Sequence, residues 1–132
     1  MKNKFMKTKI TILLILIGIL IGAISYWFQP YNQLNVFGVH TRLIWSLGAF
    51  FGSLLLYILV DEKPFKIALL ISLGVMLAII FRIIYDTIFW DSTSHNLAPF
   101  EVIVCGMVTI PSAFAGSYLV VLIKKITRYY RK

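Results

Sequence analysis

One stretch of this sequence, residues 81–101 (FRIIYDTIFWDSTSHNLAPFE), concentrates the side chains that could carry chemistry. It contains Arg82, Asp86, Asp91, His95 and Glu101. An arginine guanidinium presents a rigid fork of N–H donors that suits carboxylate and phosphate groups, whereas carboxylates beside a histidine can transfer protons or ligate a metal. The sequence on either side is almost entirely apolar, so these polar groups must be positioned by apolar elements.

A catalytic site is one hypothesis for this stretch. It would use two histidines and three carboxylates, namely His40, His95, Asp86, Asp91 and Glu101. The sequence has no HExxH motif, phosphate-binding glycine loop, nucleophile elbow or dinucleotide fingerprint. Its one cysteine, Cys105, offers no zinc-ligand spacing. We therefore predict no metal ion and no cofactor, and we leave enzymatic activity open without assigning a catalytic residue.

The elements that must position these side chains are four apolar runs. Of the 132 residues, 60% are hydrophobic and only 14% are charged, and the mean hydropathy is +0.88. A soluble domain carries about 25% charged residues, whereas apolar runs of about 18 or more residues are typical of membrane-spanning helices. We therefore predict an all-α protein, a single polytopic membrane domain (1–132) of four transmembrane helices over residues 10–28, 43–60, 67–89 and 102–123.

The positive charge of the chain, formally +8, lies mostly on one side of this four-span arrangement. Eleven of the 13 basic residues fall before the first span, between the second and third spans, or after the fourth. Because lysine and arginine are enriched in cytoplasmic loops, we predict a multi-pass protein of the cell membrane with both termini in the cytoplasm. The basic ends would then contact anionic lipid headgroups rather than nucleic acid.

The first apolar run has a second interpretation. A basic start, an apolar stretch and the small residues of Ala23-Ile24-Ser25 resemble a secretory signal peptide with its cleavage site. The run is long for a signal peptide, however, and it ends in the aromatic residues Tyr26-Trp27-Phe28, which are typical of an anchor at the membrane interface. The sequence favours a retained first span and leaves cleavage open.

Small residues recur at helical spacing in the first two spans. Gly18 and Gly22 form one GxxxG pattern, and Gly48 and Gly52 form another. This pattern permits two helices to approach closely. The sequence leaves open whether these positions pack the helices of one chain or of two.

Arg82 and Asp86 are predicted to lie near the outer end of the third span. Counting from residue 67, Arg82 lies about 22 Å along the helix and Asp86 about 28 Å, in a hydrocarbon core of about 30 Å. Side chains four residues apart on a helix can meet. The topology brings the starts of the second and fourth spans to the same level. We therefore predict an outward-facing polar site lined by Arg42, Arg82, Asp86, Glu101, Trp45, Tyr85, Trp90 and His95.

Three hypotheses for this cluster are open. We favour a pocket for an amphipathic lipid or a hydrophobic small molecule, because arginine and tryptophan suit a headgroup and the apolar helices suit a tail. Such binding could regulate or protect a membrane-protein partner. In the structural alternative, Arg82–Asp86 and Arg42–Glu101 are ion pairs that fix the helix register. In the transport alternative, a homo-oligomeric carrier or channel uses Arg82, Asp86 and Glu101, although the first span lacks the glutamate of small multidrug transporters.

Two segments resemble a known family. The sequence Leu54-Leu55-Leu56-Tyr57, followed by Asp61-Glu62-Lys63-Pro64-Phe65-Lys66, is similar to the exit and loop of the second span in the Insig (insulin-induced gene) family. The entry Asp91-Ser92-Thr93-Ser94 is also similar in character. This resemblance implies a lipid- or sterol-binding helical bundle that regulates other membrane proteins by holding them. It covers about a third of the chain, which has four predicted spans where the family has six, and no site residue is carried over from it.

Overall fold

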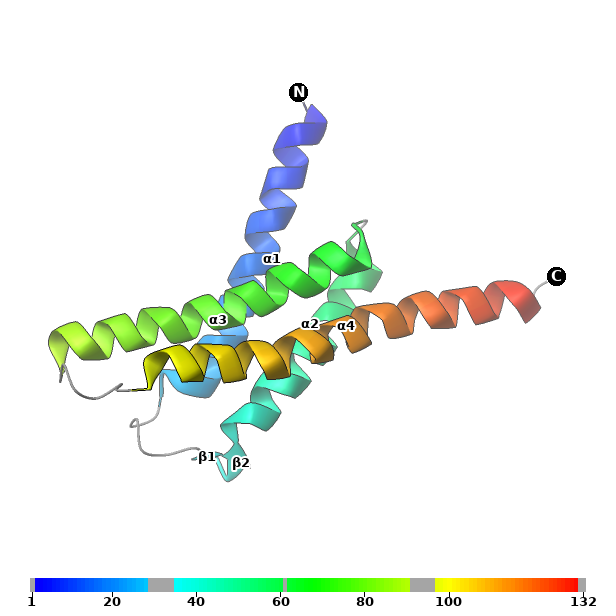
Figure 1. Cartoon of the computed structure of the whole chain (residues 1–132). Coiled ribbons are helices and arrows are strands. Elements are labelled where there is room, and N and C mark those ends of the chain that lie inside the picture. Colours follow the sequence, from blue (N-terminus) through cyan, green and yellow to red (C-terminus); the bar gives the residue numbers. More distant parts are fainter. Residues whose placement is uncertain (1, 29–34, 61, 91–96, 131–132) are drawn as a thin grey trace.

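The computed structural model describes residues 2–28, 35–60, 62–90 and 97–130, with side chains from Met6 onward. Four helices and one small hairpin make up the described chain (Figure 1). The elements are α1 (Lys2–Tyr26), β1 (Asn35–Val36), β2 (Val39–His40), α2 (Thr41–Leu59), α3 (Pro64–Phe89) and α4 (Ala98–Tyr130). Each helix is long and apolar enough to span a membrane. The predicted all-α, four-span class is therefore confirmed.

The two terminal helices are longer than the predicted spans. α1 begins at Lys2 rather than residue 10, and α4 continues to Tyr130 rather than residue 123. Hydropathy detects only the apolar part of a helix, whereas lysine and arginine are good helix formers and can extend it into water. With 33 residues, α4 is about 50 Å long, well beyond a hydrocarbon core of about 30 Å.

Backbone contact joins α1 to α3. A Cβ atom built on Gly18 would lie 2.8 Å from the Cα of Gly74, and one built on Gly22 would lie 2.6 Å from the Cβ of Ala78. Only glycine permits this approach. In Figure 1, α1 crosses behind α3, and the two helices meet along this small-residue face. The GxxxG pattern of the first span therefore packs helices of one chain.

A second close contact joins α2 to α4. Gly116 lies against the backbone of Phe50, and the Ser53 hydroxyl donates to the carbonyl of Ala113 at 2.7 Å. The hydroxyls of Ser46 and Ser112 are hydrogen-bonded at 2.8 Å. The face of α4 that carries small and polar residues is therefore turned toward α2, and α4 also runs beside α3.

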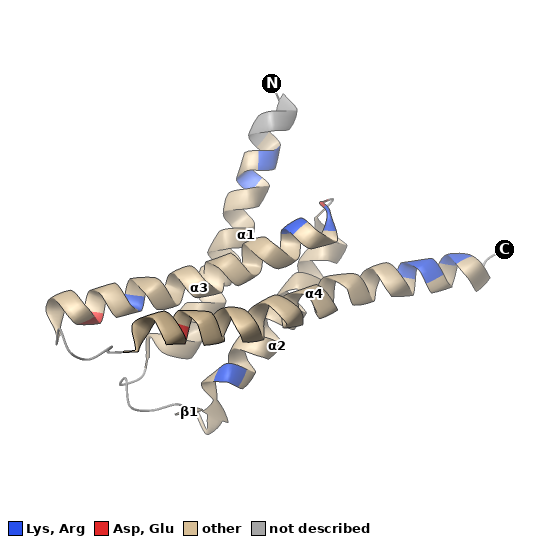
Figure 2. Cartoon of the chain, viewed as in Figure 1, with Lys and Arg blue, Asp and Glu red and all other residues tan. Residues whose placement is uncertain are grey.

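Most of the basic residues lie toward the end where α1 and α3 begin and α2 and α4 finish, while α2 and α3 each carry one arginine toward the other end (Figure 2). We call the former the lysine end, formed by Lys7, Lys9, Lys63, Lys66, Lys124, Lys125 and Arg128. Within it, the Lys66 ammonium pairs with Glu62 at 2.9 Å, and the Lys124 ammonium lies 4.8 Å from the ring centroid of Tyr57. The opposite end, where α1 and α3 finish and α2 and α4 begin, is called the aromatic end.

Candidate functional site

Arg82 is the centre of the polar contacts at the aromatic end. Its Nε donates to Asp86 Oδ2 at 2.8 Å, and its Nη1 donates to the backbone carbonyl of Trp27 at 2.6 Å. The Arg82 side chain is 16% exposed and that of Asp86 is 8% exposed. The predicted contact between Arg82 and Asp86 is therefore present. It extends from α3 to the end of α1.

One aromatic ring lies beside the Arg82 guanidinium, and two more continue from that ring along α3. The Arg82 Cζ lies 6.0 Å from the Trp27 ring centroid. The Trp27 and Tyr85 centroids are 6.1 Å apart, and those of Tyr85 and Phe89 are 5.1 Å apart. All three side chains are exposed. We call Trp27, Tyr85 and Phe89 the aromatic platform.

Two hydrogen bonds hold Trp27 in place, one through its indole ring and one through its backbone carbonyl. Its indole Nε1 donates to the carbonyl of Ala78 at 3.0 Å, while its own carbonyl accepts from Arg82. From its position, Trp27 is predicted to be an anchor at the membrane interface, and it is not among the predicted site residues. The sequence did carry a signal for its inclusion, because Trp27 ends the first span at the level predicted for Arg82.

A second set of contacts lies inside the bundle at the same end. The Tyr26 hydroxyl donates a short hydrogen bond to Glu101, which joins α1 to α4. The indole of Trp45 donates to the Ser25 hydroxyl at 2.8 Å, and Ser25 donates in turn to the carbonyl of Gly22 at 2.8 Å. The Trp45 and Tyr26 rings are 6.1 Å apart. Trp45 and Glu101 therefore contact α1 within the bundle rather than the aromatic platform.

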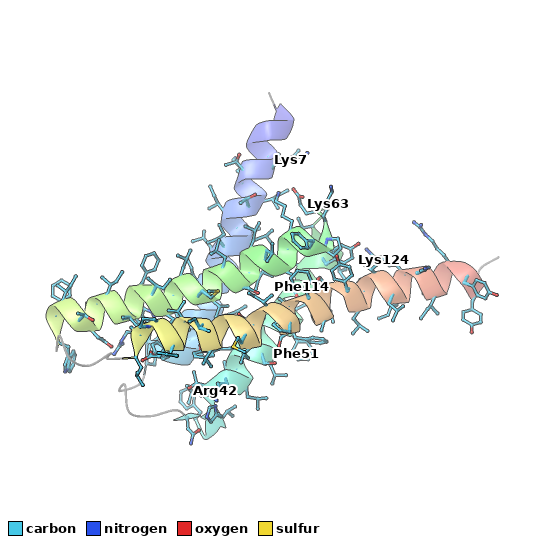
Figure 3. All side chains as sticks on the ribbon, viewed as in Figure 1. Lys7, Arg42, Phe51, Lys63, Phe114 and Lys124 are labelled. Atoms are coloured by element: carbon cyan, nitrogen blue, oxygen red, sulfur yellow. The ribbon has the colours of Figure 1, made fainter. Side chains whose placement is uncertain are left out.

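Arg42 does not pair with Glu101, as the structural alternative supposed. In the described part of the chain the two ion pairs are Lys66–Glu62 and Arg82–Asp86. Arg42 is exposed, and its backbone N–H donates to His40 Nδ1 at 3.3 Å, which caps the start of α2. Figure 3 shows Arg42 at the opposite end of the molecule from Lys7, Lys63 and Lys124. The guanidinium of Arg42 is thus available to groups outside the chain.

The remaining predicted site residues are placed in part. Trp90 follows the end of α3 and is 81% exposed. His95 lies outside the described residues, as does Asp91 from the catalytic hypothesis. Over the described ranges, no three His, Cys, Asp or Glu side chains gather as a metal ion would require.

The Arg82 guanidinium can donate further hydrogen bonds to an oxygen acceptor. The described contacts occupy the Nε–H group and one N–H group of Nη1, so the other guanidinium N–H groups remain as donors. They are held beside exposed aromatic faces, which can accept apolar groups or cations. Since Asp86 balances the charge of Arg82, the site favours a zwitterionic or uncharged polar group over a strongly anionic one.

No family model, curated protein or solved structure matches this chain. The resemblance to the Insig family therefore stays a prediction.

Proposed function

We propose that this multi-pass protein binds an amphipathic lipid or a hydrophobic small molecule, with the polar headgroup at Arg82 and the apolar part along α3. The observation that carries the proposal is the arrangement of Arg82 beside the aromatic platform. The guanidinium is anchored by Asp86 and the Trp27 carbonyl, and the exposed Trp27 ring, the first ring of the platform, lies 6.0 Å from its Cζ atom.

The apolar part of the ligand would follow one face of α3. Leu73, Leu77 and Phe81 precede Arg82 on α3 at a spacing of four residues, so they share that face, and each is exposed or half-buried. A polar group at one end of an apolar strip is the arrangement of an amphipath-binding site. An oxygen of the headgroup would accept from Arg82, and a headgroup ammonium would lie on the aromatic rings.

The other predicted site residues have supporting places in this proposal. Glu101 and Trp45 hold α1 against α4 and α2, and so keep Trp27 beside Arg82. Arg42 and Trp90 lie at the same end of the molecule and remain predicted contacts of the headgroup. His95, outside the described residues, also remains a predicted contact. A membrane-protein partner regulated by this binding also remains a prediction.

The proposed orientation places the lysine end in the cytoplasm and the aromatic end in the outer leaflet of the cell membrane. The support is the charge asymmetry, because lysine and arginine are retained on the cytoplasmic side during insertion. Single cysteines at Lys63 and at Val39 can test it in whole cells. A membrane-impermeant thiol reagent should label Val39→Cys and spare Lys63→Cys. The reverse labelling would contradict the orientation.

Lipid identification tests the proposed binding. The protein is purified in mild detergent, and co-purified lipid is identified by mass spectrometry. We expect one species enriched over the bulk membrane lipids, and its loss in Arg82→Ala, with Arg128→Ala as an arginine control at the other end. Wild-type protein that retains only bulk lipid would contradict the proposal. If Arg82→Ala lowers thermal stability without any change in lipid, the cluster has only its structural role.

Transport by a homo-oligomer is the second candidate. It is favoured by two carboxylates, Asp86 and Glu101, that the structure holds in polar contacts at the same end of the helices. Reconstitution into liposomes would distinguish it from simple binding. A cation or proton flux that Asp86→Asn or Glu101→Gln abolishes would favour transport, whereas the binding proposal predicts no flux above that of empty liposomes.

A further inference from the structure

The hairpin before α2 has an unusual residue at its tip. β1 and β2 pair antiparallel, with Val36 opposite Val39, and Phe37-Gly38 forms the two-residue turn. The φ angles of Phe37 and Gly38 are 50° and 81°. Turns with two positive φ angles favour Asn-Gly, because bulky side chains rarely adopt this conformation. Phe37 therefore occupies a position that the backbone would favour for asparagine.

The Phe37 side chain is not packed in the protein interior. It is 96% exposed, whereas its neighbour Val36 is 3% exposed. A wholly exposed aromatic ring in a disfavoured conformation is stabilised neither by local backbone preference nor by packing. This combination indicates that the ring is covered by something outside the chain.

The position of the hairpin relative to the membrane follows from α2. β2 ends at His40 and α2 begins at Thr41, so no linker separates them. The 19 residues of α2 extend about 28 Å, which is close to the hydrocarbon thickness of about 30 Å. A membrane-spanning α2 must therefore begin near the boundary of the hydrocarbon. Phe37 is four residues before Thr41 and cannot lie more than about 13 Å away from it, which confines it to the headgroup region and its surroundings.

Two neighbouring side chains match a lipid surface. Arg42 is exposed and forms no ion pair within the described residues, and Leu43 beside it is exposed as well. An arginine at the end of a transmembrane helix can reach lipid phosphate, and aromatic residues are enriched at the same depth. We propose that the hairpin is an interfacial anchor, in which Phe37 inserts into the headgroup region of the bilayer and Arg42 pairs with lipid phosphate.

This inference requires only that α2 spans the membrane, and it does not depend on a ligand at Arg82. The competing occupant is a protein partner that covers Phe37 from the aqueous side. The two occupants differ in a bilayer that contains only the purified protein, because lipid would still cover the ring there and a partner would not.

Spin-label accessibility tests the anchor. In a Cys105→Ala background, Phe37→Cys is labelled with a nitroxide and reconstituted in phosphatidylcholine nanodiscs. Thr127→Cys, near the end of the long α4, serves as the aqueous reference. Met107→Cys, whose parent side chain is 71% exposed and lies in the first third of α4, within the predicted span 102–123, serves as the bilayer reference. We expect collisions with a water-soluble nickel chelate at position 37 to be several-fold fewer than at 127. Equal collision rates at 37 and 127 would overturn the proposal, whether or not a protein crosslinks to Phe37 in cells.

A second variant, Phe37→Asn, tests the anchor without a spin label. Phe37→Asn suits the turn better than phenylalanine does, so the hairpin alone should tolerate it. The anchor predicts that hydrogen exchange of the amides at 35–40 in nanodiscs becomes several-fold faster in Phe37→Asn than in wild type, and that Phe37→Trp retains wild-type exchange. Unchanged or slower exchange in Phe37→Asn would show that no lipid contact is lost.

Discussion

The Nη1 of Arg82 donates to the backbone carbonyl of Trp27 across 2.6 Å, and so joins α3 to the residue that follows α1. A carbonyl at a helix end lacks an intrahelical partner, and in a membrane such a group is costly if it remains unsatisfied. Arg82 therefore caps α1 while its Nε contacts Asp86 on its own helix. The Arg82 side chain therefore belongs both to the proposed headgroup site and to the contact between α1 and α3.

Removal of the Arg82 guanidinium should destabilise the protein. Arg82→Ala removes both hydrogen bonds and leaves the 8%-exposed Asp86 without this partner. A broken buried pair costs about 3–5 kcal/mol. Arg82 is itself partly exposed, so we expect a loss at or somewhat below the lower end, about 2–3 kcal/mol. Unfolding in mixed micelles measures it. Asp86→Ala in the same chain should restore part of the loss, and strictly additive losses would contradict the pairing.

The contact between Tyr26 and Glu101 should couple α1 to α4. Tyr26→Phe removes the hydroxyl that donates to Glu101 while it preserves the ring beside Trp45. Side-chain hydrogen bonds between membrane helices contribute about 0.6 kcal/mol on average and up to about 1.7. We expect a coupling energy of about 1 kcal/mol in the double-mutant cycle of Tyr26→Phe and Glu101→Ala, which removes the acceptor. A coupling energy near zero would mean that the hydrogen bond does not stabilise the bundle.

Two glycine-to-alanine substitutions should differ sharply in their effect. An added methyl group at Gly74 would lie 2.8 Å from the Cα of Gly18, whereas the nearest atoms at Gly106 are the flexible end of Met76, 3.4 Å away. Both substitutions gain the same helix propensity, so their difference isolates the backbone contact. We expect Gly74→Ala to lose about 1–3 kcal/mol and Gly106→Ala to be neutral or slightly stabilising in thermal unfolding. Equal effects would contradict the close packing of α1 on α3.

Acidification should weaken the turn at the lysine end. The hydrogen bond from Lys66 is the main cause that holds the pKa of Glu62 below its ordinary value, with smaller contributions from the charges of Lys66 and Lys7. A carboxyl with a lowered pKa in the folded state adds stability at neutral pH, and this stability is lost as the pH falls through the folded pKa. The Lys66 side chain is 33% exposed and that of Glu62 is 11% exposed, so water still reaches the pair, and we expect the contribution of an ordinary i,i+4 pair, about 0.3–0.5 kcal/mol.

The titration of Glu62 can be followed by NMR of its side-chain carboxyl carbon. We expect its midpoint to lie below that of a glutamate in an unfolded peptide. Lys66→Met should raise the midpoint toward the peptide value, and Lys125→Met serves as the control elsewhere at the lysine end. A wild-type midpoint at or above the peptide value would contradict the ion pair.

The four spans could be predicted because their signal is local. An apolar run long enough to cross a membrane needs no knowledge of its neighbours, and Arg82 and Asp86 meet because the α-helix itself places residues four apart together. For the same reason the long ends of α1 and α4 were missed, since their exposed basic turns carry no hydropathy signal. Pro64 begins α3, where the fixed φ angle of proline and its missing N–H suit the first helical turn.

The partners of Glu101 and Trp27 could not be predicted because they depend on how the helices pack. Charge complementarity suggested Arg42 as the partner of Glu101. The close approach of α1 to α3 instead brings Tyr26 to Glu101 and Trp27 to Arg82. That approach is set by the position of Gly18 against Gly74, which a single GxxxG pattern does not reveal. The hairpin was also missed, because its strands are only two residues long.

Native mass spectrometry of the purified protein can show whether Arg82 and the aromatic platform bind a defined lipid or small molecule. The number and mass of retained lipids would be compared for wild type, Arg82→Lys, Tyr85→Ala and the control Arg128→Lys. Lysine keeps the charge of Arg82 but cannot reproduce its fork of donors, and Tyr85 can be removed from the surface without disturbing the Arg82–Asp86 pair. We expect a defined lipid or small molecule on wild type and on Arg128→Lys, and its loss from Arg82→Lys and Tyr85→Ala while all four remain folded. A wild-type protein that carries only a random sample of membrane lipids would contradict this expectation, as would retention of the same species by both site variants.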